Sequence, residues 1–83
     1  MTRYFFDFRD GTEFILDGEG LLIRDMAAVQ QEAAKALSGL ARDSMATFNG
    51  SQGHQMSVEV RDGDGPVMKL ELSFNITRDA GDT

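Results

Sequence analysis

The sequence predicts an α+β domain of ββαββ order, in which a four-stranded, mainly antiparallel sheet is packed on one face by a single long helix. Two observations predict it. Two pairs of alternating segments each turn on an Asp-Gly step, and one amphipathic segment separates the pairs. The 83 residues have room for one core. We therefore expect a single domain over residues 1–76 and a frayed tail over residues 77–83.

The first strand is expected over residues 3–8, where two sets of side chains alternate. Tyr4, Phe6 and Phe8 fall on one side of it, which is the two-residue period of a strand covered on one face. Asp10-Gly11 then supplies a pair that tolerates φ > 0 in a tight hairpin. Residues 13–16 return as the second strand.

Two registers are compatible with this first hairpin. A two-residue loop places Phe6 opposite Ile15, whereas a three-residue loop through Thr12 places it opposite Leu16. A one-residue slip exchanges the faces of a strand, so the alternatives differ in which side chains reach the core. Residues 17–20 end the strand, and the apolar residues 21–23 can form a short extra extended piece before the helix.

A long helix is expected over residues 25–46. Asp25 is its predicted N-cap, because its carboxylate can accept a hydrogen bond from an early helical N–H and lies at the positive end of the helix dipole. Apolar residues at steps of three and four, or multiples of these, define the expected buried face: Met26, Val29, Ala33, Leu37, Leu40 and Phe48, with Ala36 at its edge. The opposite face is polar and is expected in solvent: Gln31, Lys35, Ser38 and Arg42.

The second hairpin follows a predicted loop over residues 49–53. Its strands alternate over residues 56–61 and 68–74, and both apolar rows share a face only if Val60 lies opposite Met68. This register leaves a loop of three or five residues. It sets Glu59 across from Lys69 as a charge pair on the outer face. Pro66 then belongs to the loop or to the first position of the strand, where its missing N–H does no harm.

Composition narrows the function classes. Fourteen acidic and eight basic residues give a net charge of −6, which repels a polyanion, so no nucleic-acid partner is expected. Cysteine is absent, so disulfides and thiolate metal sites are excluded and a cytoplasmic location is expected. No apolar run approaches the roughly 20 residues of a membrane span. We expect no membrane association and no cofactor.

The motifs that could carry chemistry are weak. Asp17-Gly18-Glu19 and Asp62-Gly63-Asp64 begin like calcium loops, but the remaining ligands of an EF-hand do not follow, and the turn propensity of Asp and Gly accounts for both. His54 is the only histidine and is interpreted as a solvated loop residue. It could form a Ser-His-Asp arrangement with Ser51, Ser57 or Ser73, yet no nucleophile elbow is present. An enzyme using Asp7, Asp17 or His54 is the least favoured hypothesis.

The surface most available for a partner is the face of the sheet away from the helix. Phe5 points there on the alternation, and we predict a candidate interaction surface composed of Arg3, Phe5, Asp7, Glu59 and Lys69. The leading hypothesis is a small non-catalytic protein-interaction module that binds a protein partner or itself as a homodimer. The alternative is an antitoxin-like regulatory protein that binds a basic protein partner, by analogy with small antitoxins whose hairpin precedes an Asp-capped helix.

Several motifs together resemble a known family. They are residues 3–11 (RYFFDFRDG), the spacing of Asp17, Gly20 and Asp25, the helical Ala28, Glu32 and Ala33, and the final Asp-Gly strand pair. This set resembles a family of small uncharacterised proteins from alphaproteobacteria, including rhizobia, over nearly the whole chain. That family often has His at position 7 and Pro at position 24, where this chain has Asp7 and Arg24. The resemblance implies a ββαββ-like domain and supplies no site residues.

Overall fold

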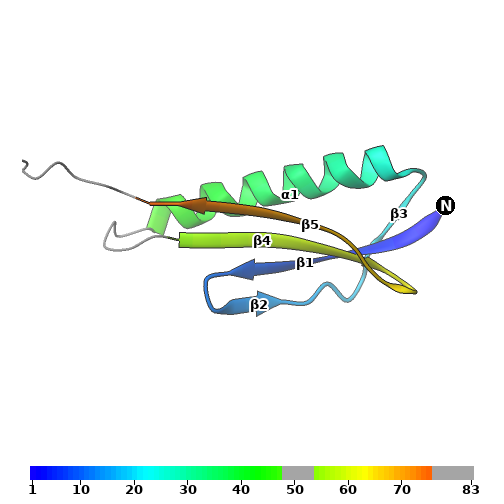
Figure 1. Ribbon diagram of the computed structural model, residues 1–83, viewed down its shortest axis with the longest axis horizontal. Coiled ribbons are helices and arrows are strands. Elements are labelled where there is room, and N and C mark those ends of the chain that lie inside the picture. Colours follow the sequence, from blue (N-terminus) through cyan, green and yellow to red (C-terminus); the bar gives the residue numbers. More distant parts are fainter. Residues whose placement is uncertain (48–53, 76–83) are drawn as a thin grey trace, which may run out of the picture.

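A computed structural model describes residues 1–47 and 54–75 as an antiparallel five-stranded sheet with one helix lying along one face (Figure 1). The elements are β1 (Thr2–Asp10), β2 (Glu13–Ile15), β3 (Leu21–Ile23), α1 (Met26–Thr47), β4 (His54–Asp62) and β5 (Gly65–Phe74). The sheet order is β2-β1-β4-β5, with β3 also paired to β1. The predicted α+β class is confirmed, and the predicted count of four strands is one short. The extra strand is β3, because residues 21–23 pair with the first residues of β1, before its pairing with β4 begins.

The first hairpin has neither of the registers predicted for Phe6. Phe8 lies opposite Ile15 and Asp10 opposite Glu13, so the two turn residues are Gly11 and Thr12. The cause is that β1 continues through Asp10, which therefore ends a strand instead of opening the turn. Gly11 takes the left-handed position with φ 63°, which glycine adopts without strain.

The helix begins as predicted. The carboxylate of Asp25 accepts a hydrogen bond from the backbone N–H of Ala28 at 2.9 Å, which confirms the N-cap. The predicted buried face is confirmed at its centre, where Val29, Ala33 and Leu37 are buried. Met26, in the first turn of α1, is 47% exposed and so departs from the predicted buried face. Phe48, the predicted loop over residues 49–53 and the predicted tail over residues 77–83 lie outside the described residues.

The second hairpin confirms that Val60 lies opposite Met68 and that Glu59 lies opposite Lys69. The ion pair of Glu59 within the described residues is with Arg9 instead. The predicted loop of three or five residues is wrong. Asp62 lies opposite Gly65, which leaves a two-residue turn, and the register shifts beyond Val60 so that Arg61 pairs with Pro66. Val67 is therefore the extra residue of a β-bulge, which accounts for the change of register between Val60 and Arg61.

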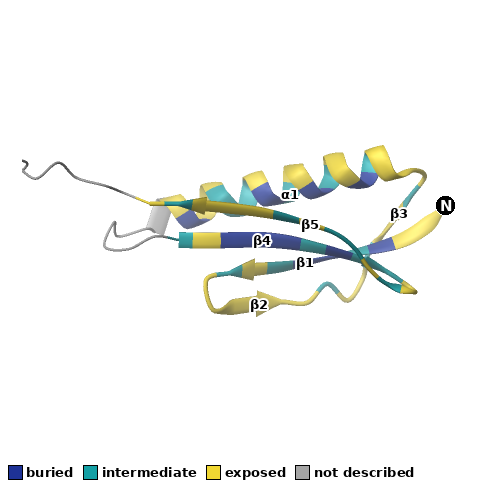
Figure 2. Cartoon of the chain, in the orientation of Figure 1, coloured by how far each residue is buried: buried dark blue, intermediate teal, exposed yellow. Residues whose placement is uncertain are grey.

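The core lies between α1 and the central strands β1 and β4 (Figure 2). Its members are Tyr4, Phe6, Val29, Ala33, Leu37, Met56, Val58 and Val60. The helix packs on β1, β3, β4 and β5 but does not contact β2. In Figure 1, α1 lies at the top and β2 at the bottom. As a result, the helix-facing side of the sheet is left uncovered beside β2.

Candidate functional site

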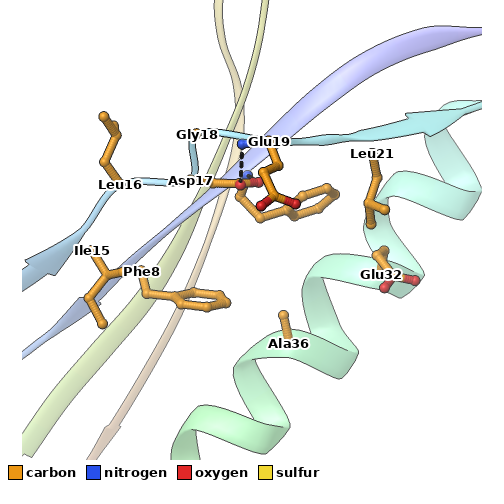
Figure 3. A pocket seen from close by; sticks show the side chains of 10 residues that line it. Phe8, Ile15, Leu16, Asp17, Gly18, Glu19, Leu21, Glu32 and Ala36 are labelled. Atoms are coloured by element: carbon orange, nitrogen blue, oxygen red, sulfur yellow. Dashed lines mark hydrogen bonds between the residues drawn. The ribbon is translucent and has the colours of Figure 1, made fainter.

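The uncovered part of the sheet forms a groove of about 490 Å³ between α1 and the segment that links β2 to β3 (Figure 3). Most of its lining is apolar: Phe6, Phe8, Ile15, Leu16, Leu21 and Ala36. Ile15 is 50% exposed and Leu16 is 63% exposed. Single exposed apolar residues are ordinary, but a contiguous set around a concave surface is a feature that ligand and partner sites share. We refer to this feature as the β2–α1 groove.

Two glutamates form one end of the β2–α1 groove. Glu19 follows the turn after β2, and Glu32 projects from α1, both near Leu21 and away from Ile15 and Leu16 (Figure 3). Neither carboxylate forms an ion pair within the described residues. The groove therefore joins an apolar floor to two unneutralised negative charges.

Asp17 shapes the loop that carries Glu19. Its carboxylate accepts hydrogen bonds from three backbone N–H groups, those of Phe6 at 3.1 Å, Glu19 at 3.0 Å and Gly20 at 3.1 Å. Burial alone would raise the pKa of Asp17, but these hydrogen bonds and the charge of Arg61 hold it below its ordinary value. Asp17 is thus an ionised structural residue that fixes one wall of the groove.

The same loop is anchored to the sheet by an ion pair between β1 and β4. The Nε of Arg61 donates to Asp7 at 2.8 Å, and its Nη2 donates to the carbonyl of Asp17 at 2.9 Å. Asp7 also accepts the backbone N–H of Asp17 at 2.9 Å. Asp7 is only 5% exposed. A buried, fully hydrogen-bonded carboxylate of this kind joins three segments and contributes to stability only while all its partners are present.

The structure places the predicted outer-face residues as follows. Asp7 is buried beneath its hydrogen-bond partners. Phe5 is half-buried, with the Arg61 guanidinium 4.4 Å from its ring centroid, and Arg3 donates to the carbonyl of Glu19 at 2.7 Å. Glu59 is paired with Arg9 at 3.2 Å, and the exposed Lys69 is 3.9 Å from Glu71. Much of this set is therefore engaged within the chain.

A second polar cluster joins the end of β1 to α1 and β4. The carboxylate of Asp10 accepts a hydrogen bond from Ser44 at 2.7 Å and makes a short contact with Nε2 of His54. His54 is therefore a half-buried strand residue rather than a solvated loop residue. In a Ser-His-Asp triad the histidine lies between the other two side chains, whereas here the carboxylate does. Among the predicted serines, Ser57 is buried in β4, Ser73 is exposed in β5 and Ser51 lies outside the described residues.

This second cluster keeps Asp10 ionised. Burial raises the pKa of Asp10. The hydrogen bonds from Ser44 and His54, together with the charge of His54, outweigh this effect and hold the pKa below its ordinary value. A carboxylate with a lowered pKa is a weak base. The arrangement ties β1, α1 and β4 together.

Acid is expected to destabilise the fold through Asp10 and Asp17. Both pKa values lie below the ordinary 3.8 in the folded protein, so the unfolded chain takes up protons first as the pH falls. The stabilisation that these two carboxylates give the folded protein is present above the pKa of the unfolded chain. It is lost as the pH falls through the lower pKa of the folded protein. Urea denaturation between about pH 6 and about pH 3 measures how the free energy of unfolding falls with pH. This fall should be shallower for Asp17→Asn than for the wild type. The exposed control Asp43→Asn should keep the wild-type slope, and an equal slope for Asp17→Asn would contradict the assignment.

The turns that resemble calcium loops use their carboxylates locally. Asp62 accepts the backbone N–H of Asp64 at 2.8 Å, much as Asp17 accepts those of Glu19 and Gly20. In the described ranges, no three His, Cys, Asp or Glu side chains are grouped to hold a metal ion. Nor does the described helix have the length and apolar character needed to cross a membrane.

The β2–α1 groove was not predicted from the sequence. Its existence depends on which strand the helix leaves uncovered, and neither composition nor periodicity determines this. The sequence feature that points to the groove is a pair of apolar dipeptides on either side of residues 17–20, namely Ile15-Leu16 and Leu21-Leu22. Alternation assigns these residues to extended segments but does not indicate which element covers them.

Comparison with known proteins identifies a family. The chain belongs to the family described as a domain of unknown function (DUF6894), whose model matches residues 3–73. No curated protein and no solved structure matches the chain. The family assignment therefore covers nearly all of the described fold and brings no activity with it.

Proposed function

We propose that this member of the DUF6894 family is a non-catalytic protein-interaction module that binds a basic, amphipathic segment of a partner protein in the β2–α1 groove. The observation that carries the proposal is the combination of an apolar floor with the carboxylates of Glu19 and Glu32, which have no ion-pair partner in residues 1–47 and 54–75. An occupant that satisfies both features has apolar side chains next to a lysine or arginine.

The dimensions of the groove support a peptide segment as the occupant. About 490 Å³ lies within the range of roughly 300–1,000 Å³ that is typical of ligand sites and accommodates a few side chains. An amphipathic helix presents such side chains at steps of three and four when it lies in a groove. The net charge of −6 adds long-range attraction for a basic partner.

A direct test uses two synthetic peptides that differ only in charge. Isotope-labelled protein is titrated with an amphipathic Leu/Lys helix and with the corresponding Leu/Glu helix, and amide shifts are followed by NMR. We expect the Leu/Lys peptide to shift the amides of residues 15–21, Glu32 and Ala36, and the Leu/Glu peptide to shift none of them. Shifts confined to the outer face of the sheet would overturn the proposed site.

Two pairs of variants localise the interaction. Leu16→Asp places a charge at the apolar edge of the groove, which Leu16 lines, and is expected to weaken Leu/Lys peptide binding at least about tenfold. Met45→Asp changes another exposed apolar residue, outside the groove, and should bind as the wild type does. Glu32→Lys should weaken binding and reduce its dependence on salt, whereas Asp43→Lys on the same helix should not.

The unpaired glutamates also favour the second candidate, an antitoxin-like protein that binds a basic protein partner. Its distinguishing property is the partner's effect on the host. Under this alternative, a basic protein co-purifies at a fixed ratio, and its expression alone arrests growth until this chain is supplied. A co-purifying partner that is harmless alone would leave the general interaction proposal and exclude this form of it.

A further inference from the structure

We infer that two copies of this chain associate through the free edge of β5, antiparallel to each other, with Leu70 on the two-fold axis. This surface is separate from the β2–α1 groove and does not depend on it. β5 is ten residues long and is the last strand of the sheet order, and among the described strands it pairs only with β4. Within the described part of the chain, one row of its backbone N–H and C=O groups is therefore open to a second strand.

The free edge of β5 is unusual in this molecule because the opposite edge is short. β2 has only three residues, which is a common way of making an edge unattractive for pairing, whereas β5 is more than three times as long. Strand addition at a long edge gains main-chain hydrogen bonds along its whole length. The length of β5 does not say which strand would pair with it. The pattern of its side chains identifies β5 of a second copy as that strand.

The helix-facing row of β5 is incompletely covered. Leu70 and Leu72 lie opposite the buried Val58 and Met56 of β4, which places them on the helix-facing side. Leu72 is nevertheless 39% exposed, and Leu70 is only half-buried. An adjacent strand with an apolar row on the same side would cover them, and β5 itself supplies such a row.

The charges of the outer row select the register. With Leu70 on the two-fold axis, Lys69 lies opposite Glu71 of the second copy, and the symmetry forms this pair twice. Met68 then lies opposite Leu72 of the second copy. Shifting either strand by two residues places Lys69 opposite Lys69 or Glu71 opposite Glu71, which is unfavourable. A one-residue shift would place the apolar row against the polar row.

The chain therefore complements itself at this edge in one register only. Lys69 and Glu71 are both about half exposed, and their contact within the chain is a long one of 3.9 Å, so both remain available to a second copy. The bulge at Val67 and the adjacent Pro66 limit regular pairing at the start of β5, so the contact centres on residues 68–72. Such an isologous contact closes at two copies.

The test exchanges the two charges. Analytical ultracentrifugation from about 5 μM to about 500 μM is expected to show a wild-type monomer–dimer equilibrium. Lys69→Glu and Glu71→Lys should each weaken self-association at least about tenfold, because each creates two like-charge contacts per dimer. An equimolar mixture of these two variants should associate again, since every contact between them pairs opposite charges. The double variant K69E/E71K should also associate.

Matched variants outside β5 establish whether association uses this edge. Lys35→Glu makes the same charge change on the exposed face of α1 and should dimerise as the wild type does. Leu16→Asp should also leave dimerisation unchanged, so that failure of the groove and failure of this edge are distinguished. Circular dichroism establishes that each variant is folded. A wild type that stays monomeric, a mixture that fails to associate, or loss of the dimer in Leu16→Asp would overturn the inference.

Discussion

Replacing Asp7 with asparagine is expected to lower the free energy of unfolding by about 3 kcal/mol. The amide is nearly isosteric, but its Nδ2–H group meets the Nε–H of Arg61 where a carboxylate oxygen now accepts at 2.8 Å. The alternative rotamer instead turns the amide toward the backbone N–H of Asp17. Either way one donor faces another in a site where Asp7 is buried. Urea denaturation with a two-state fit measures the loss.

The matched control for Asp7→Asn is Asp43→Asn, which makes the same chemical change on the exposed side of α1 and should alter stability by less than about 0.5 kcal/mol. A double-mutant cycle with Arg61→Gln isolates the pair, because Arg61 has other contacts with Asp17 and Phe5. Substantial coupling is expected between positions 7 and 61. Additive single effects would show that Asp7 acts through the Asp17 loop alone.

Local periodicity was sufficient to predict the main elements of this fold. Alternation located β1, β4 and β5, and apolar steps of three and four located α1 with its Asp25 cap. The register that sets Glu59 opposite Lys69 followed from keeping two apolar rows on one face. These predictions depend on neighbouring residues or on a single hairpin, where sequence separation is small and the physical constraint is local.

The errors arose where distant residues decide the outcome. Asp10-Gly11 has the composition of a turn, yet Asp10 ends a strand where it contacts Ser44 and His54, which are 34 and 44 positions away. Asp7 falls on the polar side of β1 by alternation, but Arg61, 54 positions away, and the Asp17 loop bury it. The β2–α1 groove depends on the position of the whole helix. Tertiary placement of this kind is not encoded in any local window.

Replacing Gly20 with alanine is expected to destabilise the protein by about 3 kcal/mol, through two independent causes. Gly20 has φ 72°, in the left-handed region that residues with a Cβ rarely adopt. A Cβ at this position would also lie 2.8 Å from the carbonyl oxygen of Tyr4, which is backbone of β1 and cannot rotate away. The loop would have to move off the strand to relieve the contact.

Gly18 provides the matched control for this change, because a Cβ there meets nothing within 4 Å and the substitution stays in the same loop. Gly18→Ala should change the free energy of unfolding by less than about 0.5 kcal/mol. Both variants are measured by thermal and urea denaturation, and equal effects would contradict the close approach of Gly20 to β1. Since the backbone N–H of Gly20 is also bonded to Asp17, displacement of this loop moves Glu19. Gly20→Ala, assayed where it is still folded, should therefore weaken binding of the Leu/Lys peptide in the β2–α1 groove, whereas Gly18→Ala should not.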